Sequence, residues 1–296
     1  MSNVKPTKNE KREQAREKAR ELRLQTAKKD KRRKITIWSS VGLVALAIVA
    51  VVTVTVTTSL QPAAKQVNPR NMMSDGLLFT GPTEVVKQEA RPLSDKRTIT
   101  ALEDDGKVNI VLYIDYSCPH CGEFEEENAS TLKQWLAEDK ITLEVHPVAV
   151  LGNEFAFRGA NAGACVADIA PEVYLDYNEA VFSQNLEGGS LGLTNRNLYK
   201  IVDGTDTSDE NKSSIKSCIK DNSFSNWVEE ASTVALNEAT AATNGAPLQG
   251  TPTVLVNGVQ YTYSFDNETF RATIEGIMAG VTVDEDGTEQ ETSPID

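Results

Sequence analysis

The longest apolar stretch of the chain lies near its start. Residues 35–60 carry no charged side chain and include the run Val41–Val52. A helix of this length would span about 39 Å, more than the ~30 Å hydrocarbon core of a bilayer. We therefore expect one transmembrane helix over residues 35–60. A cleaved signal peptide is the alternative, but its apolar region would be only about 7–15 residues long, so a retained signal anchor is favoured.

Three later stretches have the patterns of strands. The nearly continuous apolar run Val108–Ile114 is typical of a central strand covered on both faces. Ile141–Leu151 begins with alternation, and Pro147 within it favours an edge strand or a bulge. Gly250–Tyr261 predicts a strand, a turn at Asn257–Gly258 and a return strand. A shorter edge strand is expected within residues 76–81, after a polar linker over residues 61–74.

A helical pattern separates the second strand from the third. We expect a block of helices over about residues 155–242, with helices within 156–169, 174–186, 197–202, 213–220 and 224–242. A last helix is expected over residues 266–280, with Asp266 or Asn267 as its cap. The acidic residues 283–296 are expected to be disordered. This order of elements is typical of an α/β thioredoxin-like fold, here over residues 75–282, with a helical insertion.

The charge of the chain is segregated along its length. The net charge is −13, yet residues 1–34 carry 14 Lys/Arg and 5 Asp/Glu and the remaining residues carry 16 and 38. Basic residues directly before an apolar run place the N-terminus in the cytoplasm. Because the basic segment 1–34 ends at that run, it is read as a cytoplasmic segment and no nucleic-acid partner is expected. The rest of the chain would lie outside the cell membrane, attached by residues 35–60.

Candidate chemistry lies at Cys118-Pro119-His120-Cys121, between the strand Val108–Ile114 and a helix-forming stretch. Two cysteines with this spacing can form a reversible disulfide. Cys118 would sit at the helix N-terminus, where free N–H groups and the helix dipole stabilise a thiolate. Pro119 suits the first helical turn, and His120 can donate a proton or carry charge beside the sulfur. Cys121 would be the buried, resolving thiol.

Half of a zinc site is the alternative for this motif. Zinc needs four ligands, and the other nitrogen and sulfur ligands in this part of the chain are His146, Cys165 and Cys218. Neither of these cysteines has a Cys or His partner at short spacing, so redox chemistry is favoured and no metal or cofactor is expected. His146, in a predicted strand, is expected to be structural.

From about Gly76 to Gly280 the chain resembles the DsbA family of thiol–disulfide oxidoreductases, most closely the membrane-anchored members of Gram-positive actinobacteria. The resemblance rests on the motif within Asp115–Cys121, on the Ala-rich helical block with two cysteines, and on Gly250–Gly258. It implies that Pro252 is cis and faces the two motif cysteines. It also implies that Thr251 offers its backbone to the substrate, although a Gly-Thr-Pro-Thr segment by itself is equally an ordinary turn.

One departure from the family concerns proton transfer. Several family members bury an acid six residues before the first cysteine, and this chain has Leu112 there. Asp115 could replace that acid only if its side chain points inward. We expect Asp115 instead to be exposed or to brace the turn.

The remaining cysteines, Cys165 and Cys218, both lie in the helical block with apolar neighbours. Since the motif accounts for one pair, we expect a permanent Cys165–Cys218 disulfide; two buried free thiols are the alternative.

The predicted function is donation of disulfides to reduced, unfolded, exported proteins through Cys118. Re-oxidation would need a membrane partner or a small oxidant, and we expect a monomer. An exported reductase or isomerase could use the same motif at a lower potential. A non-enzymatic, membrane-tethered chaperone or binding module is the third possibility.

Overall fold

The structure is a computed structural model that describes residues 65–98, 106–188, 192–237, 247–262, 264–283 and 289–291. The predicted transmembrane helix over residues 35–60 lies outside these ranges. Within them, no helix combines the length and the apolar character needed to cross a bilayer.

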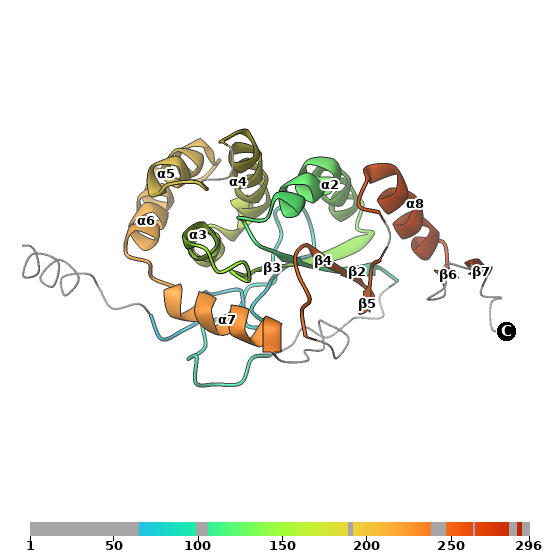
Figure 1. Ribbon diagram of the computed structural model, residues 1–296, viewed down its shortest axis with the longest axis horizontal. Helices are drawn as coiled ribbons and strands as arrows, with labels where there is room; N and C mark the ends of the chain where they lie inside the picture. Colours follow the sequence, from blue (N-terminus) through green and yellow to red (C-terminus); the bar gives the residue numbers. More distant parts are fainter. Residues whose placement is uncertain are drawn as a thin grey trace, which may run out of the picture. The chain divides into compact units, whose positions relative to one another are not determined.

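A five-stranded sheet forms the centre of the domain (Figure 1), in the order β1-β3-β2-β4-β5. The strands are β1 Leu77–Phe79, β2 Val108–Ile114, β3 Ile141–Pro147, β4 Thr253–Val256 and β5 Val259–Gln260. β2 lies between β3, to which it is parallel, and β4, to which it is antiparallel. The prediction of a central strand over Val108–Ile114 is therefore confirmed, as is the hairpin that joins β4 to β5 at Asn257–Gly258.

The prediction that Pro147 marks an edge or a bulge was wrong. β3 is an interior strand, since β1 pairs with its outer side. That pairing ends at Val145, so Pro147, the last residue of β3, has no β1 residue opposite it. A proline without an N–H is tolerated there because no partner on the β1 side requires the donor.

Helices cover both faces of the sheet. α2, Pro119–Ala137, and α8, Asn267–Met278, lie on one face and α7, Ser225–Asn237, on the other (Figure 1). Leu112, Leu143 and Val254 point into the core beneath α2 and α8, whereas Val111 and Tyr113 pack with Ala235 of α7 on the opposite face. Successive side chains of β2 thus point to opposite faces of the sheet and contribute to two hydrophobic clusters.

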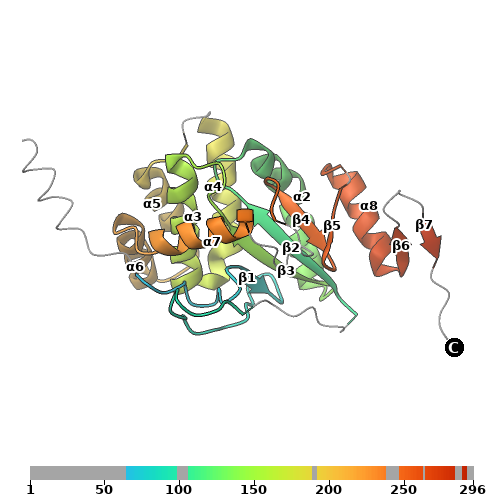
Figure 2. The same ribbon diagram turned by 60° about the horizontal axis from the view of Figure 1, so that its bottom comes forward.

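Within the helical insertion, α4, Tyr174–Gly188, packs beside α2, as Figures 1 and 2 show. The insertion also contains α3 Glu154–Ile169, the short helix η1 Pro171–Val173, α5 Asn195–Gly204, α6 Asp209–Lys220 and α7. The predicted disulfide is present and joins Cys165 of α3 to Cys218 of α6, with an S–S distance of 2.02 Å.

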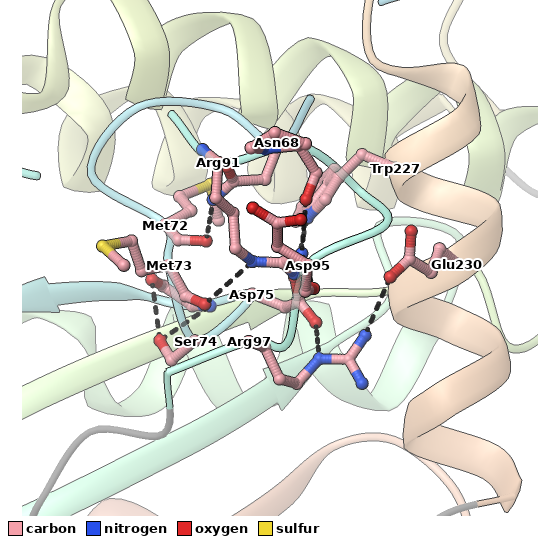
Figure 3. A network of polar contacts seen from close by, with 12 residues as sticks. Asn68, Met72, Met73, Ser74, Asp75, Arg91, Asp95, Arg97, Trp227 and Glu230 are labelled. Carbon is pink, nitrogen blue, oxygen red and sulfur yellow. Dashed lines mark hydrogen bonds and ion pairs between the residues drawn. The ribbon is translucent and has the colours of Figure 1, made fainter. Parts of the chain in front are cut away.

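The segment before β2 is bound to the domain by buried polar groups. Asp75 is its centre and accepts hydrogen bonds from Arg91, Arg97 and the indole N–H of Trp227 in α7 (Figure 3). Arg97 also pairs with Glu230 of α7.

These contacts correct the predicted linker over residues 61–74. Asn68 is fully buried, donates to the carbonyl of Met72 and accepts from the N–H of Arg91. From Lys65 onward the chain is therefore part of the domain. The prediction failed because side-chain hydrogen bonds hold this stretch in the domain. Such bonds produce no periodic pattern of apolar residues from which packing could be predicted.

Of the residues 283–296 that were predicted to be disordered, the structure describes 283 and 289–291, and there the prediction needs correction. Val281–Val283 and Glu289–Glu291 pair as the antiparallel strands β6 and β7. Backbone pairing of this kind is compatible with the acidic composition from which disorder was inferred.

Candidate active site

The candidate site is formed where β2 turns into α2. Cys118 is the N-cap of α2 and Pro119 occupies its first turn. The N–H of Cys118 donates to the carbonyl of Asp115 at 2.9 Å, which closes the turn. Since proline has no N–H to satisfy and its φ suits a helix, it starts α2 directly after the cysteine.

Asp115 braces this turn from inside the protein. One carboxylate oxygen accepts from the N–H and the hydroxyl of Ser117, at 2.9 and 2.7 Å, and the other accepts from the N–H of Leu151 at 2.9 Å. The residue is fully buried, so of the two expected states, exposed or bracing, the structure shows the second. Asp115 thereby ties the β2–α2 turn to the loop that follows β3.

The environment of Cys118 favours a thiolate. Its pKa is lowered to about 6, first by a hydrogen bond from the Cys121 thiol, with the backbone N–H groups of Cys121 and His120 adding to the effect against the opposing cost of burial. The side chain is 5% exposed. A nearly buried sulfur with N–H groups around it is the arrangement that activates a nucleophilic thiol at a helix N-terminus.

Cys121 has the opposite properties. It is fully buried, and its burial raises the pKa of its thiol well above the usual value, with the charge at Cys118 adding to the effect. Both motif cysteines are free thiols in this structure. The pair therefore combines one sulfur that ionises easily with one that stays protonated.

His120 projects into solvent from the first turn of α2. Its Nδ1 lies 2.8 Å from a carboxylate oxygen of Glu123, and its side chain is 77% exposed. The pKa of His120 is raised, first by this hydrogen bond, then by the charge of Glu123, and then by the negative charge at Cys118. The ring thus interacts with the thiolate through charge.

The loop before β4 completes the site. The Thr251–Pro252 peptide bond is cis, and the carbonyl oxygen of Thr251 lies 3.2 Å from Sγ of Cys118. The arrangement implied by the resemblance is therefore present in the structure, although Thr251 is 133 residues from Cys118 in the sequence.

Two features of the site were missed by the sequence analysis. The ring of Tyr116 lies against Gly159 and Gly163 of α3, where an added Cβ would come within 2.7 Å of the Tyr116 side chain at Gly159 and 3.0 Å at Gly163. Two glycines four residues apart form one groove on a helix, and that spacing could have been recognised in the sequence. The second feature is Glu125 of α2, which is buried.

The other candidate metal ligands do not approach the motif cysteines. Cys165 and Cys218 are bonded to each other, and the buried ring of His146 stacks on Tyr113 at 4.4 Å. In the part of the chain that the structure describes, no group of three or more His, Cys, Asp or Glu is arranged to hold a metal. A zinc site at the motif would have needed further ligands from His146, Cys165 and Cys218, and the structure does not bring these side chains to the motif.

Comparison with known proteins supports the same chemistry. A family model described as thioredoxin matches residues 96–276. Among curated protein sequences, none matches this chain significantly.

Among solved structures, the thiol–disulfide oxidoreductase MdbA from Actinomyces oris is 25% identical over 58% of this chain and 81% of its own, with a TM-score of 0.50. BdbD from Bacillus subtilis, in its oxidised form, is 17% identical over 74% of this chain and 100% of its own, with a TM-score of 0.52. MdbA from Corynebacterium matruchotii is 15% identical over 73% of this chain and 94% of its own, with a TM-score of 0.50. The last two support the fold alone.

The thioredoxin model covers more than half of the chain, and it includes the β2–α2 turn and the loop before β4. The chain belongs to the thioredoxin family, as a thiol–disulfide oxidoreductase that resembles DsbA.

Proposed function

We propose that this protein is a membrane-anchored, extracytoplasmic enzyme that donates disulfides to reduced, unfolded, exported proteins. A substrate thiolate attacks the Cys118 sulfur of the Cys118–Cys121 disulfide and forms a mixed disulfide. A second substrate thiol then attacks the substrate sulfur, so that the substrate leaves oxidised and both motif cysteines are left reduced. Two electrons pass from the substrate to the enzyme.

The difference in ionisation between the two cysteines carries this proposal. Cys118 has a pKa of about 6, whereas burial raises the pKa of Cys121. A stabilised Cys118 thiolate stabilises the reduced enzyme, and whatever stabilises the reduced form makes the disulfide a stronger oxidant. Cys118 is also the better leaving group when the substrate is released, since a thiol of lower pKa leaves faster.

The loop before β4 supplies a place for the substrate backbone. The Thr251 carbonyl oxygen lies 3.2 Å from the Cys118 sulfur. An extended peptide that pairs with the backbone of Thr251 would have its own cysteine close to Cys118. Thr251 and Pro252 therefore bind the substrate in this proposal.

The location follows from the amino-terminal sequence. The basic segment 1–34 stays in the cytoplasm, residues 35–60 cross the membrane, and the catalytic domain acts outside. Disulfides form and persist in that compartment. Electrons taken from substrates would leave through a membrane partner or a small oxidant, with the protein acting as a monomer.

Refolding of reduced, unfolded ribonuclease tests the proposal. The oxidised full chain should restore ribonuclease activity, whereas Cys118→Ala should not. Efficient reduction of insulin without oxidation of ribonuclease would instead favour an exported reductase or isomerase. Absence of both activities would favour a tethered binding module.

A further inference from the structure

A buried carboxyl group in α2 has no part in the site described so far. Glu125 is 5% exposed although it lies in the acidic stretch Glu123–Glu127. Its neighbours Glu126 and Glu127 are exposed. Burial of an ionisable group is costly unless a partner or a proton neutralises it, so the position of Glu125 requires an explanation.

Helix geometry places Glu125 next to the resolving cysteine. It follows Cys121 by four residues in α2, so the two side chains are neighbours on one helix face, with about 5–6 Å between their Cβ atoms. Helical side chains lean toward the N-terminus, which directs Glu125 over the turn that contains Cys121. Both residues are buried.

A neighbouring helix holds the Glu125 carboxyl in place. Asn178 of α4 donates a hydrogen bond from Nδ2 to Oε1 of Glu125 at 2.9 Å. In the same packing, an added Cβ at Gly122 would lie 3.0 Å from Leu186 of α4. The carboxyl therefore occupies a close contact between α2 and α4.

The surroundings leave a large fraction of this carboxyl protonated near neutral pH. Burial raises the pKa of Glu125 to about 7, against the hydrogen bond from Asn178 and the charge of Lys133, while Glu179 raises it further. Its charge in turn helps to raise the pKa of the buried hydroxyls of Tyr116 and Tyr174. The Lys133 ammonium, whose charge favours ionisation of Glu125, is itself paired with Asp176 and Glu179.

When the Cys118–Cys121 disulfide opens, the Cys121 sulfur needs a proton. When a thiolate attacks Cys118, Cys121 leaves as a thiolate in a fully buried site that disfavours its charge. Asp115 is poorly suited to supply the proton because its two oxygens already accept three hydrogen bonds. The apolar Leu112 has no proton to give.

We propose that Glu125 donates the proton that Cys121 takes up when the Cys118–Cys121 disulfide opens, and takes it back when the disulfide re-forms. The transfer runs directly or through one water molecule. The attacking thiolate is consumed in the mixed disulfide, the S–S electron pair goes to Cys121, and the Glu125 proton converts that sulfur to a thiol. Glu125 then regains a proton from solvent. The proposal rests on disulfide exchange at Cys118 and holds for either direction of electron flow.

Single-turnover opening of the disulfide tests this step. The oxidised full chain, in detergent, is mixed with excess dithiothreitol, quenched with acid, and analysed for free Cys121 by alkylation and mass spectrometry. At pH 6 the glutamine in Glu125→Gln matches the charge of the protonated wild-type side chain but has no acidic proton. We expect its rate to be on the order of 100-fold below wild type at pH 6, with the gap closing above pH 8, where wild type has also lost the proton.

Matched variants separate proton donation from a structural role. Glu126→Gln, one position along the helix and exposed, should react like wild type, and Glu125→Asp should recover part of the rate. A rate for Glu125→Gln within twofold of wild type at pH 6, or a loss that does not change with pH, would overturn the proposal.

Stability supplies an independent check on the same variant. The folded pKa of Glu125 lies above its usual value of 4.5, so its stabilising contribution is complete below that value and is lost as pH rises through about 7. Glu125→Gln should therefore melt above wild type by a margin that grows between pH 4.5 and 7. If the protein failed to oxidise ribonuclease but its disulfide still reacted normally with dithiothreitol, the proposed substrate would be rejected. The role of Glu125 would still be tested by the dithiothreitol reaction.

Discussion

At the scale of single residues, the two motif cysteines have different chemistry although only two residues separate them. Cys118 lies at the helix N-terminus with N–H groups around its sulfur, and Cys121 lies one turn inside the core. Lowering the pKa of Cys118 to about 6 from about 8.5 in an unfolded chain stabilises the reduced protein by about 1.4 kcal/mol at pH 7. That corresponds to about 30 mV of oxidising power.

Alkylation should distinguish the two cysteines. With limiting iodoacetamide at pH 7, Cys118 of the reduced protein should react at least ten times faster than Cys121, because only Cys118 is mostly ionised there. Peptide mass spectrometry measures the ratio. Correspondingly, Cys121→Ala should accumulate mixed disulfides with exported proteins and Cys118→Ala almost none. Faster labelling of Cys121 would contradict the assignment.

The stability of the reduced protein should depend on pH in a defined window. Because the folded pKa of Cys118 is depressed, its contribution is complete above about pH 8.5 and disappears as pH falls through 6. The melting temperature of the reduced form, relative to the oxidised form, should therefore rise between pH 6 and 8.5. Calorimetry of both forms measures it. Cys118→Ser cannot form the motif disulfide, so its melting temperature is compared with that of the oxidised wild type, and the difference should not rise over this range. If it does rise, another group is responsible.

At the scale of elements, close packing of α3 against the β2–α2 turn orients the active site. Gly159 and Gly163 leave room for the Tyr116 ring, and Asp115 ties the same turn to the loop after β3. The disulfide Cys165–Cys218 fixes α3 to α6. The insertion is thus a support for the turn that carries Cys118, and glycine is required in α3 for steric reasons.

Two helical glycines should respond oppositely to alanine. Gly159→Ala places a Cβ 2.7 Å from Tyr116 and should lower the free energy of unfolding by about 1–3 kcal/mol through overpacking. Gly276→Ala in α8 meets no atom within 4 Å and should be neutral or stabilise by up to about 1 kcal/mol through helix propensity. Urea unfolding of both variants measures the difference. Equal effects would show that the groove at Gly159 is not closely packed.

At the scale of the whole molecule, charge and hydropathy divide the chain into two parts of different composition. The amino-terminal segment is basic and leads into an uncharged apolar run, whereas the remainder is strongly acidic. The thioredoxin-like domain begins soon after that run, since the chain from Lys65 onward is already packed on it.

Protease treatment of intact cells tests this topology. Proteolysis should release the domain with the Cys118–Cys121 motif and leave the first residues protected inside, because in the proposed topology the Lys/Arg cluster before residue 35 keeps the N-terminus in the cytoplasm. Antibodies against each end, with cell lysis as the control for protease access, detect the two fragments. A mature protein that begins near Ala64 would show a cleaved signal peptide instead.

The sequence by itself determined the features that depend on local chemistry. The Cys118–Cys121 motif, the central strand Val108–Ile114 and the hairpin turn at Asn257–Gly258 each depend on residues close together in the chain. The sequence also narrowed the cap of the last helix to Asp266 or Asn267, and the structure shows Asp266. The block of helices was predicted with ends a few residues from those observed, since helix ends depend on neighbours as well as on pattern.

Only the tertiary structure decided which distant groups meet. The Thr251 carbonyl reaches Cys118, and the Leu151 N–H reaches Asp115, through contacts that no local pattern encodes. Glu125 is the clearest case. The stretch Glu-Phe-Glu-Glu-Glu is typical of a solvated helix face, so the sequence gives no sign that one of its acids is buried. The packing of α4 against α2 buries Glu125 alone of these four acids, because its place on the helix faces Asn178 of α4, whereas Glu123, Glu126 and Glu127 remain in water.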